Sequence, residues 1–159
     1  MTKTNIVKYV PGVACLVVQN GNIVFEERAP GRDGAGLLDF CSGHIESGET
    51  PGYTMQRELF EELGVPYEHS ANLVEIGRCT MHLEKRQKEK DWDMVFYCLE
   101  IPADITLTLQ HVEVATIKRQ PFANGIDTIK NDATQFPYDQ MVPIIKKFEQ
   151  IYARMARLK

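Results

Sequence analysis

The sequence has no apolar run that approaches the roughly 20 residues a helix needs to cross a bilayer. Its first five residues, MTKTN, provide neither the apolar core nor the cleavage site of a secretory leader. Basic residues are also few, because 18 Lys and Arg stand against 22 Asp and Glu and give a formal charge of −4. This balance disfavours a broad cationic surface for nucleic acid. These absences predict a cytoplasmic protein without a membrane partner.

The sequence likewise lacks Cys-x-x-Cys pairs, repeats, low-complexity tracts and linkers rich in Pro, Gly or Ser. Three of its four cysteines fall in apolar, strand-like runs, so we expect reduced core thiols and neither a zinc site nor a disulfide framework. The cysteines are Cys15, Cys41, Cys79 and Cys98. A length of 159 residues, with 43% hydrophobic and 25% charged residues, is typical of one globular domain. We therefore expect a single domain over residues 1–159.

Strand-like segments dominate the chain. The runs 13–18 and 22–25 are rich in β-branched and apolar residues and flank Asn20-Gly21, a strong signal for a hairpin. The first run is continuously apolar, which indicates a strand buried on both faces. Further strands are expected at residues 37–41, 73–81, 92–101 and 112–117. Helical spacing of apolar residues between 144 and 158 predicts a C-terminal helix.

A second helix is expected over Pro51–Leu63. Thr50 suits the N-cap, Pro51 the first turn and Gly64 the left-handed position after the last turn. Residues 119–138 show no clear periodicity, so this segment is expected to be a functional loop or a short irregular helix. Strands with two helices predict a mixed α/β or α+β domain.

The helix at residues 51–63 is strongly acidic on one face. At 100° per residue, Glu58, Glu61 and Glu62 fall within an arc of about 100°. Like charges at this spacing destabilise a helix, whereas a hard divalent cation such as Mg²⁺ or Mn²⁺ would reverse that effect. A solvated acidic face is the alternative interpretation. Metal binding is favoured because Leu59 and Leu63 place the carboxylates beside a buried stripe.

Two further features of this region indicate a preformed ligand-binding site. Gly43 and Gly48 allow the backbone of the preceding loop to approach a ligand closely. Arg57 precedes the first carboxylate, and Glu49 is available as its partner. An arginine–carboxylate pair would fix both the loop and the acidic face.

The segment Gly43–Val65 resembles the Nudix box, G-x5-E-x7-R-E-U-x-E-E-x-G-U, where U is an aliphatic residue. Every defined position matches: Gly43, Glu49, Arg57, Glu58, Leu59, Glu61, Glu62, Gly64 and Val65. The order of elements around the box also looks like the Nudix α/β/α sandwich, an α/β fold with a mixed sheet. The resemblance implies Mg²⁺-dependent hydrolysis of a nucleoside diphosphate that is linked to another group.

The resemblance also implies roles for individual residues. Glu58, Glu61, Glu62 and the carbonyl of Gly43 would hold one or more Mg²⁺ ions, with Mn²⁺ as an alternative. Arg57 would act with the carboxylates in catalysis, whereas Glu49 and Gly64 are structural members of the box. The general base stays open among the box carboxylates, Glu46 in the box loop and Glu113 in a later strand. Glu46 stands at an undefined position of the box, whereas Glu113 lies outside the box, between Val112 and Val114, where a solvent-facing strand residue is the alternative.

Two more residues are candidates for substrate binding. Arg28 resembles an arginine that many Nudix enzymes place near substrate phosphate, and an exposed basic residue at a strand end is the alternative. His44 is a candidate donor in the loop beside the substrate.

The sequence departs from the family at the entrance to the box. Cys41-Ser42 precede Gly43, where many members carry Pro-Gly. Residues 78–84 lack the proline of ADP-ribose pyrophosphatases and the tyrosine of dinucleoside polyphosphate hydrolases. The expected substrate is a soluble nucleotide: a nucleoside triphosphate, a nucleotide sugar or a related compound. The alternatives are a non-catalytic, nucleotide-binding regulatory domain and an RNA 5′-end pyrophosphohydrolase. A homodimer is a further expectation, since many Nudix enzymes are dimers.

Overall fold

The computed structural model describes residues 8–84, 90–109 and 114–159. Within these ranges, seven strands form one mixed sheet in which β1 and β6 are parallel and the other pairs are antiparallel. The strands are β1 (Val10–Gln19), β2 (Asn22–Arg28), β3 (Leu38–Asp39), β4 (Cys41–His44), β5 (Val74–Leu83), β6 (Lys90–Ile101) and β7 (Val114–Pro121). The order across the sheet is β3-β2-β1-β6-β5, with β4 paired to β1 and β7 paired to β2.

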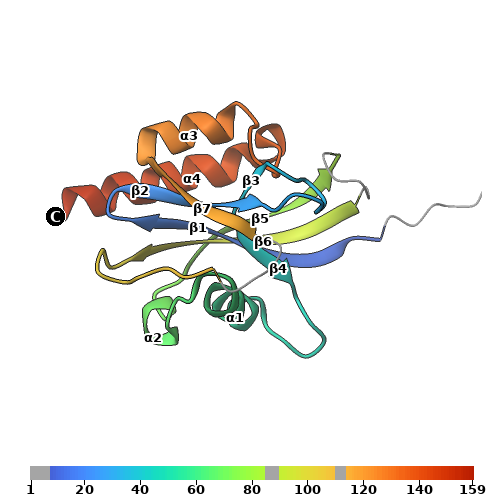
Figure 1. The fold of residues 1–159 in the computed structure, drawn as a ribbon, viewed down its shortest axis with the longest axis horizontal. Coiled ribbons are helices and arrows are strands. Elements are labelled where there is room, and N and C mark those ends of the chain that lie inside the picture. Colours follow the sequence, from blue (N-terminus) through green and yellow to red (C-terminus); the bar gives the residue numbers. More distant parts are fainter. Residues whose placement is uncertain (1–7, 85–89, 110–113) are drawn as a thin grey trace, which may run out of the picture.

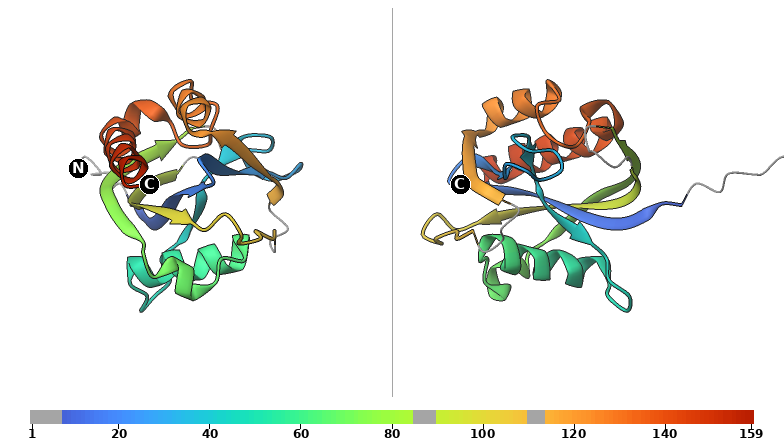
Figure 2. Two further views of the ribbon diagram at one scale, coloured as in Figure 1. Left: turned by 90° about the vertical axis from the view of Figure 1, so that its left-hand side faces the viewer. Right: turned by 45° about the vertical axis from the view of Figure 1, so that its right-hand side comes forward.

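Helices cover both faces of this sheet, as Figures 1 and 2 show. The helices are α1 (Pro51–Leu63), α2 (Tyr67–Ser70), α3 (Phe122–Lys130) and α4 (Tyr138–Arg157). Apolar residues of α1 pack with one side of the sheet, and those of α3 and α4 pack with the other. The predicted α/β/α sandwich with a mixed sheet is therefore confirmed.

The central strand β1 changes partner along one edge. Its residues Gly12 to Cys15 pair with β4, whereas Val17 to Gln19 pair with β2. The strands β2 and β4 therefore pair with different segments of the same edge of β1, and they diverge as they run away from β1. The run 13–18 is at most 3% exposed, which confirms the prediction of a strand buried on both faces.

Helix α1 begins and ends where the sequence predicts. The Thr50 side chain accepts a hydrogen bond from the backbone N–H of Tyr53, and Pro51 occupies the first turn. At the other end, Gly64 adopts the left-handed conformation with φ of 68°, and its N–H donates to the Phe60 carbonyl. Both ends of the helix are thus fixed by local contacts.

The expectation of two helices is wrong. The described residues contain four, because α2 forms a single turn after α1 and α3 lies inside the aperiodic segment 119–138. For that segment α3 agrees with the expected alternative of a short helix. In α3, Ile126 and Ile129 are buried against the sheet, but two apolar positions are too few to create a periodic signal over that segment. Among the described helices, none combines the length and the apolar character needed to cross a membrane.

The strand expected at residues 37–41 is divided in two. Phe40 is fully buried at the division, where the chain leaves its pairing with β2 and takes up pairing with β1. As a consequence β4 extends through His44, which corrects the expected loop position of this histidine. The strand expected at 112–117 is β7; residues 112 and 113 lie outside the described ranges, and β7 continues to Pro121.

Candidate active site

A pocket of about 230 Å³ lies between the end of β4, helix α1 and the adjoining ends of β5 and β6. One part of its lining is acidic, and the other is apolar and aromatic. The acidic members are Glu46, Glu58 and Glu62; the apolar members are Leu83, Trp92, Met94 and Phe136; Arg28, Ser42, Gly43 and His44 complete the lining. Two of the three glutamates that the box spacing places on one helical face therefore meet in the pocket.

The contact between α1 and β4 is set by a glycine. The Glu58 carboxylate lies so close to Gly43 that a β-carbon at that position would overlap its oxygen and its carboxyl carbon. Gly43 pairs with Val13 in the β1–β4 ladder, so the sheet fixes its backbone. A carboxylate can reach the strand here only because residue 43 has no side chain.

Arg57 joins the box loop to the acidic face of α1. Its Nε and Nη2 atoms donate to the two oxygens of Glu49 at 2.8 and 2.9 Å, and this observation confirms the expected pairing. Its Nη1 atom donates to Glu58 Oε1 and to Glu61 Oε2, both at 3.0 Å. These hydrogen bonds lower the pKa of Glu49 and raise that of Arg57. One guanidinium thus holds three carboxylates in place.

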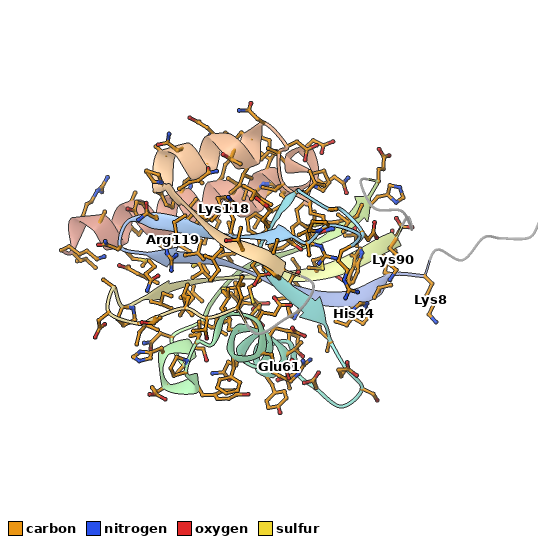
Figure 3. All side chains as sticks on the ribbon, viewed as in Figure 1. Lys8, His44, Glu61, Lys90, Lys118 and Arg119 are labelled. Atoms are coloured by element: carbon orange, nitrogen blue, oxygen red, sulfur yellow. The ribbon has the colours of Figure 1, made fainter. Side chains whose placement is uncertain are left out.

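Glu61 and Glu46 occupy different surroundings from Glu58. The Glu61 side chain is 50% exposed, is not part of the pocket lining and is bound by Arg57; Figure 3 labels it on α1. Glu46 is exposed, lines the pocket, and its N–H donates to Glu49 Oε1 at 3.0 Å. Glu113 lies outside the described residues.

Glu62 extends toward a buried acidic group that the sequence analysis missed. Glu26 on β2 is 3% exposed and Asp39 on β3 is 1% exposed, and the two residues pair across the β2–β3 ladder. Burial raises the pKa of Glu26 to about 8, with a further contribution from the charge of Asp39. Burial also raises the pKa of Glu62 well above its ordinary value, and Glu26 adds to this shift.

Alternation along β2 could have identified Glu26. Val24 is buried on the side of the sheet that faces α1, and a residue two positions later in a strand points the same way. The expected strand ended at Phe25, so Glu26 was not among the candidate residues. The structure continues the strand through Arg28.

Arg28 lies at the acidic side of the pocket. Its Nε atom donates to the carbonyl oxygen of Asp33 at 3.1 Å, and its Nη1 atom lies 3.6 Å from Asp39 Oδ2. The side chain is largely buried, which disagrees with the alternative of an exposed residue at a strand end. Its contact with substrate phosphate stays a prediction.

His44 lies at the apolar side. Its ring centroid is 4.7 Å from that of Trp92, and the two planes are inclined by 51°. Trp92 is 5% exposed, whereas His44 is exposed at the end of β4. The pair forms an aromatic wall beside the carboxylates, of a kind on which a planar ring can stack.

The residues present fit a hard divalent cation. Glu58 lies against Gly43, and Glu62 lines the same pocket. Glu62 Oε2 is buried without a hydrogen-bond partner among the described residues. Burial raises the pKa of Glu58 despite the nearby Arg57. The negative charges of Glu58 and Glu62 are therefore costly to bury unless a metal cation neutralises them. Carboxylate and carbonyl oxygens are the ligands that Mg²⁺ and Mn²⁺ prefer.

Comparison with known proteins gives a consistent result. A family model of the NUDIX domain matches residues 8–140. The chain is 40% identical over 55 residues to an 8-oxo-dGTP diphosphatase of Haemophilus influenzae, and the matched segment covers 33% of this chain and 40% of that protein. It is 36% identical over 58 residues to a CTP pyrophosphohydrolase of Escherichia coli, and this match covers 36% of this chain and 43% of that protein. The chain thus spans less than half the length of these curated relatives.

Solved structures resemble the whole fold. A MutT protein from Methanosarcina mazei superposes with a TM-score of 0.65, at 16% sequence identity, over 92% of this chain and 96% of that chain. At this level of identity the similarity concerns the fold alone.

Proposed function

The chain belongs to the Nudix family, and we propose that it is a metal-dependent pyrophosphohydrolase acting on a nucleoside diphosphate that is linked to another group. A nucleoside triphosphate is our first candidate, because the names of both curated relatives specify a nucleoside triphosphate as substrate. The observation that carries the proposal is one pocket with carboxylates at one side and an aromatic wall at the other. Such a pocket suits a ligand with a phosphate chain and a planar base.

The acidic side would hold the cation and the phosphates. Glu58, Glu62 and the carbonyl of Gly43 are the proposed ligands of Mg²⁺, and Glu61 would have to release Arg57 before it could join them. A bound divalent cation would neutralise charge on the phosphate oxygens and make coordinated water more acidic. Arg28, anchored by Asp33 and Asp39, would present its guanidinium to a phosphate oxygen.

The chain's own residues would prepare the attack. Arg57 positions Glu58 and the box loop, so both approach the phosphate in a fixed geometry. The proton of the attacking water would pass to a pocket carboxylate, and Glu46 or Glu62 are the described candidates. His44 and Trp92 would stack on the base, so that the bond between two phosphoryl groups lies over the carboxylates.

A substrate panel tests this function. The full chain is incubated with nucleoside triphosphates, nucleotide sugars, dinucleoside polyphosphates and 5′-triphosphorylated RNA, with and without Mg²⁺, and the products are identified by ion-exchange chromatography. We expect Mg²⁺-dependent release of a nucleoside monophosphate and pyrophosphate from a triphosphate. Glu62→Gln should reduce kcat by about 10²–10⁴-fold, whereas Glu68→Gln on α2, which is exposed and outside the pocket, should be active.

Two outcomes would replace this proposal. Tight binding of a nucleotide without product, across the whole panel, would support a regulatory domain. Turnover of RNA with no turnover of free nucleotides would support a 5′-end pyrophosphohydrolase. Full activity of the Glu62→Gln protein would refute the role given to the acidic side of the pocket.

A further inference from the structure

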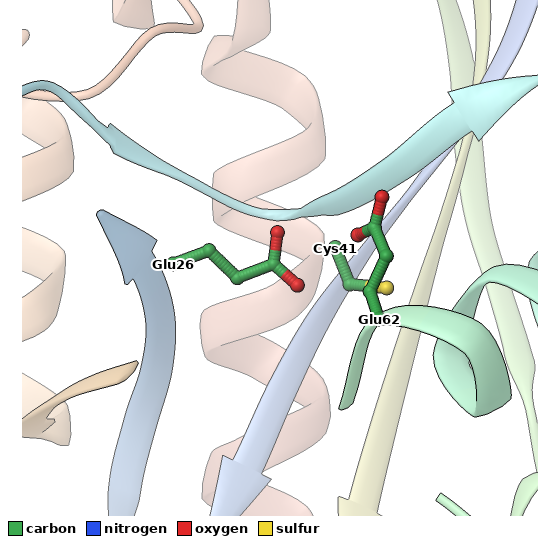
Figure 4. A group of neighbouring side chains, drawn as sticks. All are labelled: Glu26, Cys41 and Glu62. Atoms are coloured by element: carbon green, nitrogen blue, oxygen red, sulfur yellow. The ribbon is translucent and has the colours of Figure 1, made fainter. Parts of the chain in front are cut away.

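A second group of potential metal ligands lies behind the pocket, where β2, β4 and α1 meet. Glu26, Cys41 and Glu62 each direct one ligand atom to the same place, and these atoms all lie within 4.8 Å of one another. Figure 4 shows the two carboxylates and the thiol converging from three elements. Because β2 and β4 share an edge of β1 and then separate, residues from both strands can face α1 here.

One carboxylate oxygen of each glutamate lacks a hydrogen-bond partner among the described residues. Glu26 is 3% exposed, and its Oε1 atom has no hydrogen-bond partner among the described residues. Oε2 of Glu62 is equally inaccessible and without a partner in the same part of the chain. Two buried carboxylates that face each other are unfavourable unless a proton or a cation lies between them. These buried oxygens are therefore well placed to bind a cation.

The thiol makes this ligand set different from the one assigned to Mg²⁺. Cys41 is 2% exposed, and burial raises its pKa well above the ordinary value, with smaller contributions from Glu62 and Glu26. A cation that binds the sulfur must displace the proton of the thiol. Thiolate ligands favour Zn²⁺ and Co²⁺, whereas Mg²⁺ is bound by oxygen.

We propose that Glu26, Cys41 and Glu62 form an inner cation site that binds a thiophilic divalent cation of the zinc class. For Cys41 this proposal replaces the expectation of a core thiol that takes no part in a zinc site. Glu62 also lines the pocket, which gives the cation a route of entry. The inner site rests on the proposed function only through this shared residue: a cation bound here would occupy Glu62 and inhibit Mg²⁺-dependent turnover.

Cobalt titration tests the inner site directly. Co²⁺ is added to the metal-free full chain without substrate, and absorption in the near ultraviolet reports a bond between cobalt and a thiolate. We expect a charge-transfer band that saturates at about one equivalent. Zn²⁺ should remove the band by direct competition. Mg²⁺ competes only for the shared Glu62, so it should weaken the band only at a large excess. Cys41→Ser should abolish the band.

Cys15→Ser is the matched control. Cys15 is also fully buried, belongs to the same core cluster and pairs directly with Cys41 across the β1–β4 ladder. Its replacement should leave the cobalt band intact. Glu26→Gln keeps the thiol and the shape of the site, and should weaken cobalt binding about tenfold or more.

Three results would overturn the inner site. They are a wild-type protein without a charge-transfer band, a band that persists in Cys41→Ser, and a band that is lost in Cys15→Ser. Should Cys41→Ser fail to fold, as judged by circular dichroism, unchanged cobalt affinity of folded Glu26→Gln would refute the proposal. Hydrolysis without the cobalt band would refute the inner site alone, and the band without any hydrolysis would refute the proposed function alone.

Discussion

The Glu58 carboxylate occupies the space in which a β-carbon of residue 43 would lie. Strand β4 and helix α1 are therefore matched at this point by the absence of a side chain. The contact gives the glycine of the box a packing role in addition to its carbonyl, and it leads to the first of four predictions.

Gly43→Ala should abolish most of the activity while the protein stays folded. The added methyl group must displace Glu58 from the strand, and a displacement of about 1 Å at a catalytic centre can cost about 100-fold in rate. Steady-state kinetics with the best substrate measures this loss. Gly52→Ala is the control, because a β-carbon there would lie 3.9 Å from the Tyr97 hydroxyl and should stabilise α1 by about 0.5–1 kcal/mol. Equal kinetics for the two variants would contradict the packing role.

Arg57→Lys should behave as a severe substitution. A lysine ammonium cannot reproduce the two-atom contact with Glu49 while also reaching Glu58 and Glu61. We expect kcat to fall about 10–100-fold and the melting temperature to fall by a few degrees. Arg78→Lys, which changes an exposed pair with Glu75, should alter neither quantity. A fully active Arg57→Lys protein would show that charge alone is sufficient at this position.

The metal-free protein should become less stable as the pH rises from about 5 to about 8. Burial raises the pKa of Glu26 from 4.5 to about 8, so the folded protein holds this proton more tightly than the unfolded chain does. The corresponding stability is fully present below pH 4.5 and is lost as the pH rises through about 8. Thermal unfolding in excess chelator measures the effect.

Glu26→Gln should flatten this pH profile, since the amide does not titrate. A divalent cation should restore the stability of the wild type at pH 8, because a ligand that binds only the folded state stabilises it. A wild-type melting temperature that is constant across this range would contradict the interpretation of the buried carboxylates.

His44→Ala should affect substrate binding more than chemistry. The side chain is exposed and contacts Trp92, so its removal should leave stability almost unchanged. Loss of one stacking contact, about 1–2 kcal/mol, should raise KM by about 5–30-fold at similar kcat. His69→Ala, outside the pocket, is the control. A fall in kcat with unchanged KM would instead place His44 near the reacting atoms.

The sequence predicted the parts of the site that are local in the chain. Thr50, Pro51 and Gly64 fix α1 by contacts within a few residues, and Arg57 meets Glu49 because both belong to one loop and helix. The sequence did not predict which of the three carboxylates on the acidic face of α1 would line the pocket. Glu61 shares the acidic arc with Glu58 and binds the same arginine, yet its side chain is half-exposed and lies outside the pocket lining.

The parts that could not be predicted depend on strands that are distant in sequence. Glu26 faces Glu62 only because β2 leaves the edge of β1 after Val24 and runs past the end of α1. Neither the pairing of β2 with β3 nor the division of the strand at Phe40 has a signature in a single sequence. The inner carboxylates were missed for this reason.

The parallel pairing of β1 and β6 has a consequence for synthesis of the protein. Val10 pairs with Trp92 and Gln19 with Ile101, so the central strand obtains its second neighbour only after most of the chain has left the ribosome. Contacts between such distant segments form slowly. All residues proposed to coordinate a metal ion lie within residues 26–62, which are translated well before β6. The acidic residues are therefore synthesised early, and strand β6, which helps to shield them from solvent, is synthesised later. During that interval nascent chains would expose their carboxylates and thiol to cellular cations before the pocket exists to select among them.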